Sequence, residues 1–328
     1  MSLVSEIEKF TRKFLYFTPY YNRRSPINPE EPEIYNSHGQ KLHVFFMSDR
    51  EISHNPYAAR QPEYIFWDRY NFALKTHFYS HYEAFNLVGS PDKRFAFLNE
   101  SRAIKPKCYK KYLREKKYFE NEFDLLFTFD IDILETINNA RLVPFCANYW
   151  YGEIDRNIKL SRDNYLRKDK NISILSSHKK SCELHLLRKA LAFKCRDQKL
   201  ADAYGTFDTG EKGSLIPPER TLEKYRYSII IENDITPYFF TEKITNCFAA
   251  ETIPIYLGAT KIHEFFNPDG IINISVKDAQ NIEHVLKQCT PAEYERRLPA
   301  ILDNFERVKK FRSMYDYMFA KYLRNLYE

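Results

Sequence analysis

The chain has 328 residues, 44% hydrophobic and 29% charged, a composition typical of a folded protein with room for two domains. Its 50 basic and 44 acidic residues give a formal net charge of +6, and the two signs are interspersed. With no basic arm, recognition helix or aromatic RNA-binding motif, this balance argues against a nucleic-acid partner and is compatible with an anionic small molecule.

The cysteines and the N-terminus bear on the cellular compartment. None of the six cysteines forms a CxxC pair, which favours free thiols in a reducing compartment over a zinc site. The segment 1–21 (MSLVSEIEKFTRKFLYFTPYY) has charged residues among its apolar ones, and so matches neither a signal peptide nor a membrane-spanning helix. We therefore expect a cytoplasmic protein, at most peripheral on the inner membrane, or a Golgi-lumen protein if an N-terminal anchor has been removed.

After a Pro-rich loop, the first half alternates apolar runs with helical segments, which predicts a parallel α/β sheet. Strands are expected at 41–49, 93–101, 123–130 and 140–148. An exposed helix is expected at 105–120, where basic residues dominate. His77 and His81 have metal-binding spacing for one face of a helix, but without a third ligand we favour packing or contact with a ligand.

A charged segment from Gly152 to Asn171 lacks apolar periodicity and is expected to link two domains. Beyond it the alternation restarts and predicts a second Rossmann-like unit. Its strands are expected at 172–177, 201–207, 227–233, 252–258 and 270–275, with helices at 182–194 and 241–250. The predicted organisation is an N-terminal domain at 1–160, a C-terminal domain at 161–290 and a helical tail at 291–328.

The tail has apolar residues at helical spacing, with basic and aromatic residues interleaved from about 306 to the end. Two interpretations are open. The tail can make peripheral contact with an anionic membrane surface, or it can pack back across the N-terminal domain. We prefer packing.

The sequence YSIIIENDITPYFFTEKITNCF places an acid and a base, Glu242 and Lys243, where a strand passes into a helix. Thr241 is a suitable N-cap, so both residues fall in the first helical turn, at the edge of the sheet where ligands bind. The helix N-terminus and Lys243 favour a phosphate, and the Glu242 carboxylate can accept hydrogen bonds from a ribose diol. In the alternative interpretation, Glu242 only offsets the helix dipole and Lys243 is a solvated charge.

The same region resembles the signature block of the α1,3-fucosyltransferases, glycosyltransferase family 10. Ten residues separate Glu232 from Glu242, as in that family, and Thr252–Gly258 (TIPIYLG) matches its final element. Upstream, Arg188 lies seventeen residues before Gly205, the spacing of the preceding family block. The N-terminal phrases FAFLNESRAIKP and FDLLFTFDIDILE resemble the family's E-S-P and F-D-x-x-F-T patterns.

The resemblance, which extends over about 93–275, implies a GT-B fold, in which two Rossmann-like domains face a cleft. The C-terminal domain would bind the GDP-fucose donor, and the N-terminal domain a glycan acceptor that contains N-acetylglucosamine. Transfer would invert the anomeric carbon. It would need no metal ion or other cofactor, so cationic side chains would have to stabilise the departing GDP.

The resemblance also implies roles for individual residues. Glu100 would be the catalytic base that takes the proton of the acceptor hydroxyl, unless it is only a loop carboxylate that caps the next helix. Arg188 would hold phosphate oxygens with its forked guanidinium. The implied donor-binding residues are Arg188, Tyr204, Gly205, Glu232, Asn233, Phe239, Thr241, Glu242 and Lys243.

Three positions depart from the family pattern. Asp234 replaces a serine and would put a carboxylate near the phosphates. Phe239 replaces a tyrosine whose hydroxyl would contact the donor, and Arg102 replaces the proline of E-S-P. These changes leave two alternatives, a transferase for another GDP-sugar and a non-catalytic nucleotide- or glycan-binding protein of the same fold.

Two further signals carry competing interpretations. The sequence DID, Asp130 to Asp132, matches the Asp-x-Asp metal motif of the other major glycosyltransferase fold. We favour the alternative, a strand terminus with two solvated carboxylates. His185, on the same helix as Arg188, is expected to be a half-buried histidine rather than a catalyst.

Overall fold

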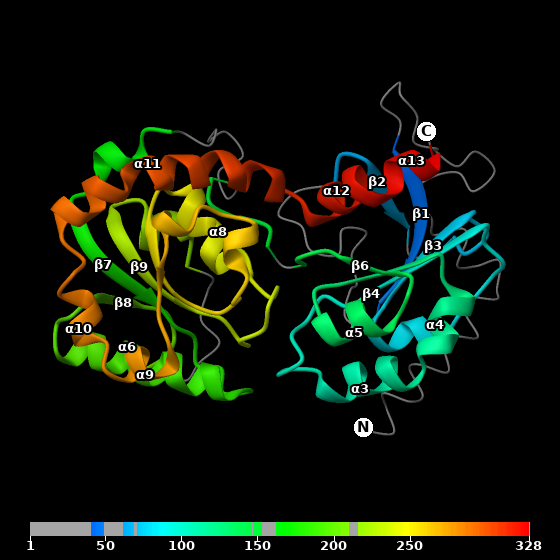
Figure 1. Cartoon of the computed structure of the whole chain (residues 1–328), viewed down its shortest axis with the longest axis horizontal. Coiled ribbons are helices and arrows are strands. Elements are labelled where there is room, and N and C mark those ends of the chain that lie inside the picture. The colour runs from blue at the N-terminus through cyan, green and yellow to red at the C-terminus, as the bar shows by residue number, and fades with distance from the viewer. Residues whose placement is uncertain are drawn as a thin grey trace.

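Two parallel β-sheets with helices packed on them make up the protein (Figure 1). The computed structural model describes residues 41–48, 62–68, 71–145, 147–152, 162–209 and 216–327. Within these residues every strand pairing is parallel. The predicted α/β class is thus confirmed, and two such domains facing one pocket, described below, form the expected GT-B arrangement.

The N-terminal sheet has six strands in the order β2-β1-β3-β4-β5-β6. They are β1 (Leu42–Met47), β2 (Ile65–Asp68), β3 (Thr76–Ser80), β4 (Lys93–Phe97), β5 (Leu125–Thr128) and β6 (Ala140–Leu142). β1 is buried along its whole length, in agreement with its nearly continuous apolar run. β2 and β3 are strands that the sequence pattern does not predict, because IFWD and THFYS are short and carry polar residues.

His77 and His81 do not share a helix, so the expected helical spacing is wrong. His77 lies in β3, whereas His81 begins the 3₁₀ helix η1 (His81–Phe85) with a φ of 51°. The His77 ring is buried with Nδ1 3.0 Å from the Tyr79 hydroxyl. Burial lowers the pKa of His77 to about 4. His77 is therefore a neutral core residue, as the packing interpretation has it.

The region 105–120 forms two helices, α3 (Pro106–Arg114) and α4 (Lys116–Glu122), rather than one exposed helix. Their inner face is aromatic: Tyr112 stacks on Phe119 with ring centroids 4.1 Å apart, and Phe119 lies 5.3 Å from Phe85. The many lysines between these rings mask the stripe in the sequence. A shorter helix, α5 (Ile131–Thr136), follows β5.

The C-terminal sheet has five strands in the order β11-β10-β9-β7-β8, each at a predicted position. They are β7 (Lys170–Leu175), β8 (Asp202–Tyr204), β9 (Tyr225–Ile231), β10 (Ile253–Leu257) and β11 (Ile272–Asn273). From β7 the chain passes to β8 on one side and then returns to β9 on the other. The sheet therefore has its topological switch point at the carboxyl ends of β7 and β9, where open α/β sheets bind ligands.

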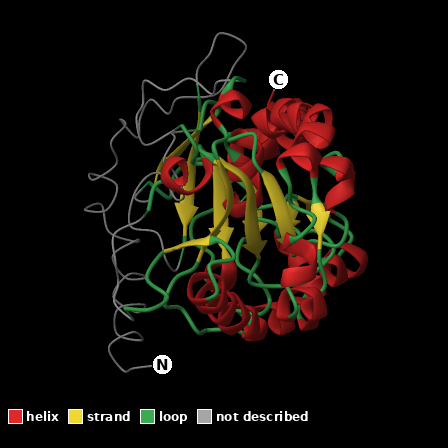
Figure 2. Ribbon diagram, turned by 90° about the vertical axis from the view of Figure 1, so that its left-hand side faces the viewer, coloured by secondary structure: helices red, strands yellow, loops and turns green. Residues whose placement is uncertain are grey.

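Helices cover both faces of this sheet (Figure 1, Figure 2). The helices of the domain are α6 (Glu183–Asp197), α7 (Pro218–Leu222), α8 (Glu242–Ala249), α9 (Val276–Gln280) and α10 (Glu283–Leu286), with 3₁₀ turns η2 (Asn164–Arg167), η3 (Ile262–Glu264) and η4 (Pro268–Gly270). α8 lies on one face with the C-terminal helix α11 (Pro291–Val308), and α6 and α9 lie on the other. α6 and α8 thus approach the switch point from opposite faces.

The expected linker is in part a structural element of the C-terminal domain. Residues 153–161 lie outside the described residues, but η2 and the start of β7 occupy its second half. There the buried Lys168 ammonium donates to the carbonyls of Leu222 and Ala250 and to Thr252 Oγ1, at 2.7–3.0 Å. The sequence alone does not distinguish such a buried lysine from the surface lysines around it.

The tail continues beyond α11 through the 3₁₀ turn η5 (Lys309–Phe311), α12 (Met314–Met318), the π-turn η6 (Phe319–Leu323) and α13 (Arg324–Tyr327). α11 lies along the C-terminal domain, and α12 and α13 lie on the N-terminal sheet beside β1 and β2 (Figure 1). There Asp316 Oδ1 accepts from the N–H of Tyr64 at 3.2 Å, and the rings of Tyr315 and Trp67 are 4.7 Å apart. The tail therefore packs on the N-terminal domain, the interpretation preferred above. In the described part of the chain, no helix is both long and apolar enough to span a bilayer.

Candidate functional site

A cavity of about 570 Å³ lies between the two domains at the switch point of the C-terminal sheet. Its size suits a ligand as large as a nucleotide. Most of the wall comes from the C-terminal domain, and Glu100 and Trp150 close it from the N-terminal side. The predicted site residues that line the cavity are Glu100, Arg188, Gly205, Asn233, Phe239, Thr241, Glu242 and Lys243.

The start of α8 forms one side of this cavity. The Thr241 side chain caps the helix by accepting from the Lys243 N–H at 3.3 Å. Lys243 Nζ donates to Thr241 Oγ1 at 2.8 Å and to Glu232 Oε2 at 3.2 Å, and Glu242 Oε1 is 3.5 Å away. Burial opposes the charge, but the carboxylates of Glu232 and Glu242 outweigh it and raise the pKa of Lys243. Lys243 is thus a positioned cation rather than a solvated one.

Glu232 supports the site from behind the cavity wall and does not line it. Its carboxylate is fully buried and accepts from the Thr241 N–H at 2.9 Å and the Thr241 hydroxyl at 2.8 Å, in addition to Lys243. Gly258 leaves the room that this carboxylate needs, since a Cβ there would lie 2.6 Å from Glu232 Cγ. The role that the geometry gives Glu232 is therefore to hold the cap and the ammonium in place.

Arg188 projects from α6 and is 6% exposed. Its Nη1 donates to the carbonyl oxygen of Ile231 at 2.7 Å, at the end of β9. Its Nε has no hydrogen-bond acceptor among the described residues. Burial lowers the pKa of Arg188, against the opposing charge of Glu232, but an arginine stays protonated. A buried guanidinium with an unused donor beside a cavity favours an anionic ligand there.

His185, one turn before Arg188, fixes the side chain of Asn233. Its Nδ1 accepts from the N–H of Ser181 at 3.2 Å, so the proton resides on Nε2, which donates to Asn233 Oδ1 at 2.9 Å. Burial and the charge of Arg188 lower the pKa of His185 and keep the ring neutral. His185 is therefore a positioning histidine, consistent with the expectation that it is not a catalyst.

Gly205 allows the loop after β8 to pass against the loop after β7. It has a φ of +108°, and a Cβ at this position would lie 1.9 Å from the carbonyl oxygen of Ser176, itself a wall residue. Tyr204, expected beside it in the donor site, does not line the cavity. Its hydroxyl instead lies 2.7 Å from that of Tyr225, which donates to Asp202. The Tyr204 hydroxyl therefore lies toward Tyr225, the first residue of β9, and away from the carboxyl ends of the strands, where the cavity is.

We expect Gly205→Ala to lower the melting temperature and weaken nucleotide binding together, because the strained backbone costs about 1–3 kcal/mol and must displace Ser176 from the cavity wall. Gly89→Ala is the matched control. Gly89 has a φ of +63° and its Cβ would meet the Phe72 carbonyl oxygen at 2.6 Å, in the other domain. That variant should lose stability without losing GDP affinity in calorimetric titrations. Equal GDP affinity in both variants would contradict the role given to Gly205.

Several wall residues were not predicted from the sequence. They are Trp150, Ser176, Ser177, His178, Lys179, Thr206, Thr221 and Asn246. The polar run that holds Lys179 directly follows an expected strand, so the rule that ligands bind at strand carboxyl ends could have identified it. No such signal exists for Trp150, whose backbone N–H donates to Asn246 Oδ1 at 2.6 Å across 96 positions of sequence.

Glu100 faces these groups from the N-terminal domain. It follows β4, is half-buried, and its Oε1 accepts from the N–H of Ser101 at 2.9 Å. It does not cap α3, whose N-cap is Lys105 and lacks a side-chain hydrogen bond. The helix-cap alternative for Glu100 is therefore wrong. Glu100 lines the same cavity as Arg188 and Lys243.

The two aspartates of DID are engaged by one arginine. Arg102 donates to both oxygens of Asp130, through Nε at 2.9 Å and Nη2 at 2.5 Å, and through Nη1 to Asp132 at 2.6 Å. Asp130 also caps α5 by accepting from the Ile133 N–H. They are thus ion-paired, and Asp130 is buried, so the expectation of two solvated carboxylates is wrong. Among the described residues, no group of three or more His, Cys, Asp or Glu could hold a metal ion.

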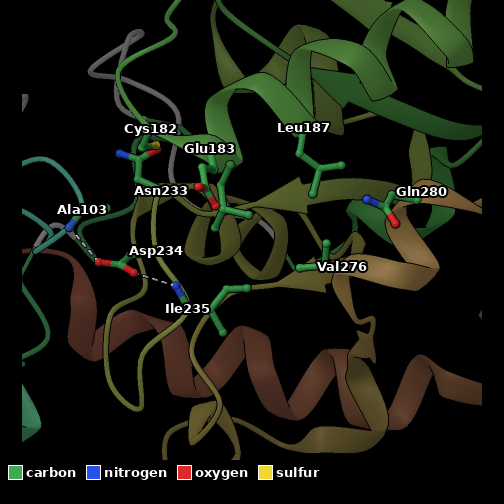
Figure 3. Close-up of a pocket in the computed structure, with 10 residues that line it drawn as sticks. Ala103, Cys182, Glu183, Leu187, Asn233, Asp234, Ile235, Val276 and Gln280 are labelled. Atoms are coloured by element: carbon green, nitrogen blue, oxygen red, sulfur yellow. Dashed lines mark hydrogen bonds between the residues drawn. The ribbon is translucent and has the colours of Figure 1, made fainter.

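Asp234 lies elsewhere than expected. It does not line the cavity that holds Arg188 and Lys243, but a second hollow, beside Ala103 and the start of α6 (Figure 3). The prediction that it brings a carboxylate to the phosphates is wrong. The reason is that its carboxylate is used elsewhere: Asp234 Oδ2 accepts from the N–H of Ala103 at 2.9 Å, on the other domain.

Comparison with known proteins bears on the C-terminal domain. Residues 165–297 match the model of the family described as glycosyltransferase family 10 (fucosyltransferase), C-terminal. Over 65 residues, the chain is 32% identical to the alpha-(1,3)-fucosyltransferase FucT of Helicobacter pylori. This alignment covers 20% of the chain and 13% of that relative. The resemblance to the family is confirmed for the domain that carries most of the cavity.

Solved structures with similar overall arrangement include an alpha1,3-fucosyltransferase with GDP, at a TM-score of 0.48 and 15% identity. That similarity covers 93% of this chain and 98% of the other. A sucrose-phosphate synthase from Thermosynechococcus elongatus is similar at a TM-score of 0.49 and 11% identity, over 77% and 73% of the two chains.

Proposed function

We propose that this chain, whose residues 165–297 form a C-terminal domain of glycosyltransferase family 10, moves L-fucose from GDP-fucose to a hydroxyl of a glycan acceptor. The observation that carries the proposal is the convergence of Arg188, Lys243 and the N-terminus of α8 on one cavity, with Glu100 opposite. The family match and the alpha-(1,3)-fucosyltransferase relative support fucose as the sugar. We propose in addition that the acceptor contains N-acetylglucosamine.

The donor half of the reaction needs positive charge where GDP departs. As the bond between the anomeric carbon and the β-phosphate oxygen breaks, its electron pair moves to that oxygen and the phosphate gains negative charge. Lys243 and the guanidinium of Arg188, which both line the cavity, can stabilise this charge, and the N–H groups at the start of α8 contribute their dipole. Glu242, in the same turn, is suited to accept hydrogen bonds from the ribose hydroxyls.

The acceptor half needs a base on the opposite side of the sugar. The acceptor hydroxyl attacks the anomeric carbon in one displacement, which inverts the configuration, and its proton passes to a carboxylate oxygen of Glu100. The placement of Glu100 on the other domain supports this role, because the acceptor must approach from the side away from GDP. The anomeric carbon passes through an oxocarbenium-like state, as in glycoside hydrolysis.

The proposal is tested by incubating the protein with GDP-fucose and a panel of glycans and measuring fucosylated product. A thermal-shift screen across nucleotide sugars precedes it, since a ligand that binds only the folded protein raises the melting temperature. We expect GDP-fucose and GDP to stabilise the protein, and UDP-sugars not to do so. A larger shift with another GDP-sugar would favour the first alternative, a different donor, which the replacement of tyrosine by Phe239 keeps open. Binding without any GDP release would identify a non-catalytic protein.

We expect fucose transfer to continue in EDTA, because Arg188 and Lys243 supply the charge that a cation brings in metal-dependent transferases. The ion pair of Arg102 with Asp130 and Asp132 supports this expectation, since both carboxylates are already neutralised. The measurement is the initial rate before and after chelation. If EDTA abolished transfer and Mn²⁺ restored it, the Asp-x-Asp interpretation of DID would replace the metal-free one.

A further inference from the structure

The three positions at which the sequence departs from the family pattern, Arg102, Asp234 and Phe239, meet at the boundary between the domains. Asp234 Oδ2 accepts from the N–H of Ala103 at 2.9 Å, a hydrogen bond that crosses from one domain to the other (Figure 3). The ring of Phe239 lies 4.9 Å from that of Phe129, again across the boundary. Arg102 stands between these two contacts on the N-terminal side.

The N-terminal side of the boundary consists of two loops that Arg102 fastens together. The loop after β4 carries Glu100 and Ala103, and the loop after β5 carries Phe129 and Asp130. The three hydrogen bonds of Arg102 to Asp130 and Asp132 tie the first loop to the second. A displacement of one loop is therefore transmitted to the other.

The C-terminal side is a single loop, from Glu232 at the end of β9 to Thr241 at the cap of α8. Both ends of this loop hold Lys243 through hydrogen bonds. Asp234 and Phe239 lie within it, so the segment that holds the proposed phosphate-binding lysine also touches both N-terminal loops. Asp234 uses one oxygen for Ala103 and the other, Oδ1, for the N–H of Ile235 at 3.0 Å.

A serine at position 234 could not make both contacts. Its side chain is one bond shorter than that of aspartate, and its single oxygen cannot occupy the two positions from which Oδ1 meets the Ile235 N–H and Oδ2 meets the Ala103 N–H across the boundary. Likewise, proline at 102 has no group that could reach Asp130. The departures at 102 and 234 are thus related by geometry, since each supplies an atom that joins two of the three loops. The ring of Phe239 adds an apolar contact to the same boundary, one that a tyrosine ring would also make.

We propose that Arg102, Asp234 and Phe239 form one interdomain latch that positions Glu100 over the donor cavity. The inference rests on the proposed function, because its consequence for catalysis requires Glu100 to be the base. Domains joined by a small interface move relative to one another by default, and a misplacement of about 1 Å between reacting groups can lower a rate about 10²-fold. The latch restricts this motion at the loop that carries Glu100 and at the loop whose two ends hold Lys243. Arg102 and Asp234 are positioning residues, since neither lines the cavity.

The test uses Asp234→Ser, Arg102→Ala and the double variant in the full chain, with Asp269→Ser, an exposed aspartate of η4 that lines neither hollow, as control. We expect each latch variant to lower kcat for transfer by about 10- to 100-fold while the KM for GDP-fucose and the Kd for GDP stay within about two-fold. Because both residues act through one latch, the double variant should lose little more than either single variant. A fall in melting temperature with matching losses in Kd and kcat, or fully multiplicative losses in the double variant, would overturn the proposal.

A second measurement does not depend on activity. Hydrogen exchange of the Ala103 amide should accelerate in Asp234→Ser and stay at the parent rate in Asp269→Ser, because only the first variant removes its acceptor. If the Ala103 amide exchanged faster in Asp234→Ser but the parent protein transferred no fucose, the interdomain contact would be supported and the proposed function refuted. If the parent protein transferred fucose, but Asp234→Ser changed neither the exchange of the Ala103 amide nor kcat, the latch would be refuted and the proposed function would stand.

Discussion

Replacing Glu100 by glutamine should lower the rate of fucose transfer by about 10²–10⁴, the usual contribution of a positioned general base. The substitution keeps the shape of the side chain and removes its basicity, so the acceptor hydroxyl would attack without losing its proton. Folding should be unaffected, because the hydrogen bond to the Ser101 N–H needs only an oxygen acceptor, which glutamine retains. GDP binding should also match that of the parent, since Glu100 faces the donor site from the other domain.

The measurement is the single-turnover rate with saturating acceptor, beside calorimetric titration of GDP. Glu135→Gln, the same change at an exposed position of α5 in the same domain, is the control and should transfer at the parent rate. A Glu100→Gln protein that stays within a few-fold of the parent would show that Glu100 is not the base. The search would then turn to other N-terminal acids, first Asp130, which is ion-paired with Arg102.

Removing either cation from the cavity should weaken GDP binding by about 1–3 kcal/mol, the cost of a charge-assisted contact. Arg188→Ala loses the guanidinium of the cavity wall, and Lys243→Ala loses the ammonium beside Thr241. Their effect should be confined to the phosphates. Both variants should therefore bind guanosine as the parent does. Glu242→Ala should instead weaken GDP and guanosine alike, because its proposed contact is with the ribose.

Stability must be separated from binding in these variants. Lys243→Ala leaves the buried carboxylate of Glu232 without its ion-pair partner, so part of its effect will be a lower melting temperature. Lys189→Ala, at the next position of α6 after Arg188 but outside the cavity wall, controls for the loss of a positive charge near the site. If all three cavity variants bound GDP as tightly as the parent, the assignment of the cavity to the donor would be wrong.

The C-terminal domain could be predicted well because its signals are local. Three consecutive isoleucines, Ile229 to Ile231, mark a buried strand, and Thr241 before an acid marks a helix start, so both ends of the key loop followed from the sequence. The sequence did not predict that Glu232 is buried behind the cavity wall. The family spacing marks this residue as part of the site, but it does not tell whether the carboxylate contacts the ligand or holds Thr241 and Lys243 in place. Tyr204 is a second example. It stands beside Gly205 as the family block requires, but the sequence does not show that its hydroxyl lies against that of Tyr225 rather than in the cavity.

The N-terminal domain was harder, since its decisive contacts join residues distant in sequence. β2 and β3 are short strands that become regular only by pairing with β1. The hydrogen bond between Asp234 and Ala103 spans 131 positions, and no property of either residue alone indicates it. The partner of Asp130 was hidden for the same reason, because Arg102 reads as a surface charge until the two loops are brought together.

The packing of the tail on the N-terminal sheet sets the order in which the protein can be completed during synthesis. Tyr64 and Trp67 pack against Phe319 and Tyr315, residues made about 250 positions later. At about 5–20 residues per second, the ribosome needs roughly 10–50 s to make the intervening chain. For that time β2 is an edge strand whose aromatic residues lack their covering helices, a state prone to pairing with other chains. α12 and η6 thus complete the N-terminal domain, and the nascent protein depends on Tyr315 and Phe319 to cover Tyr64 and Trp67.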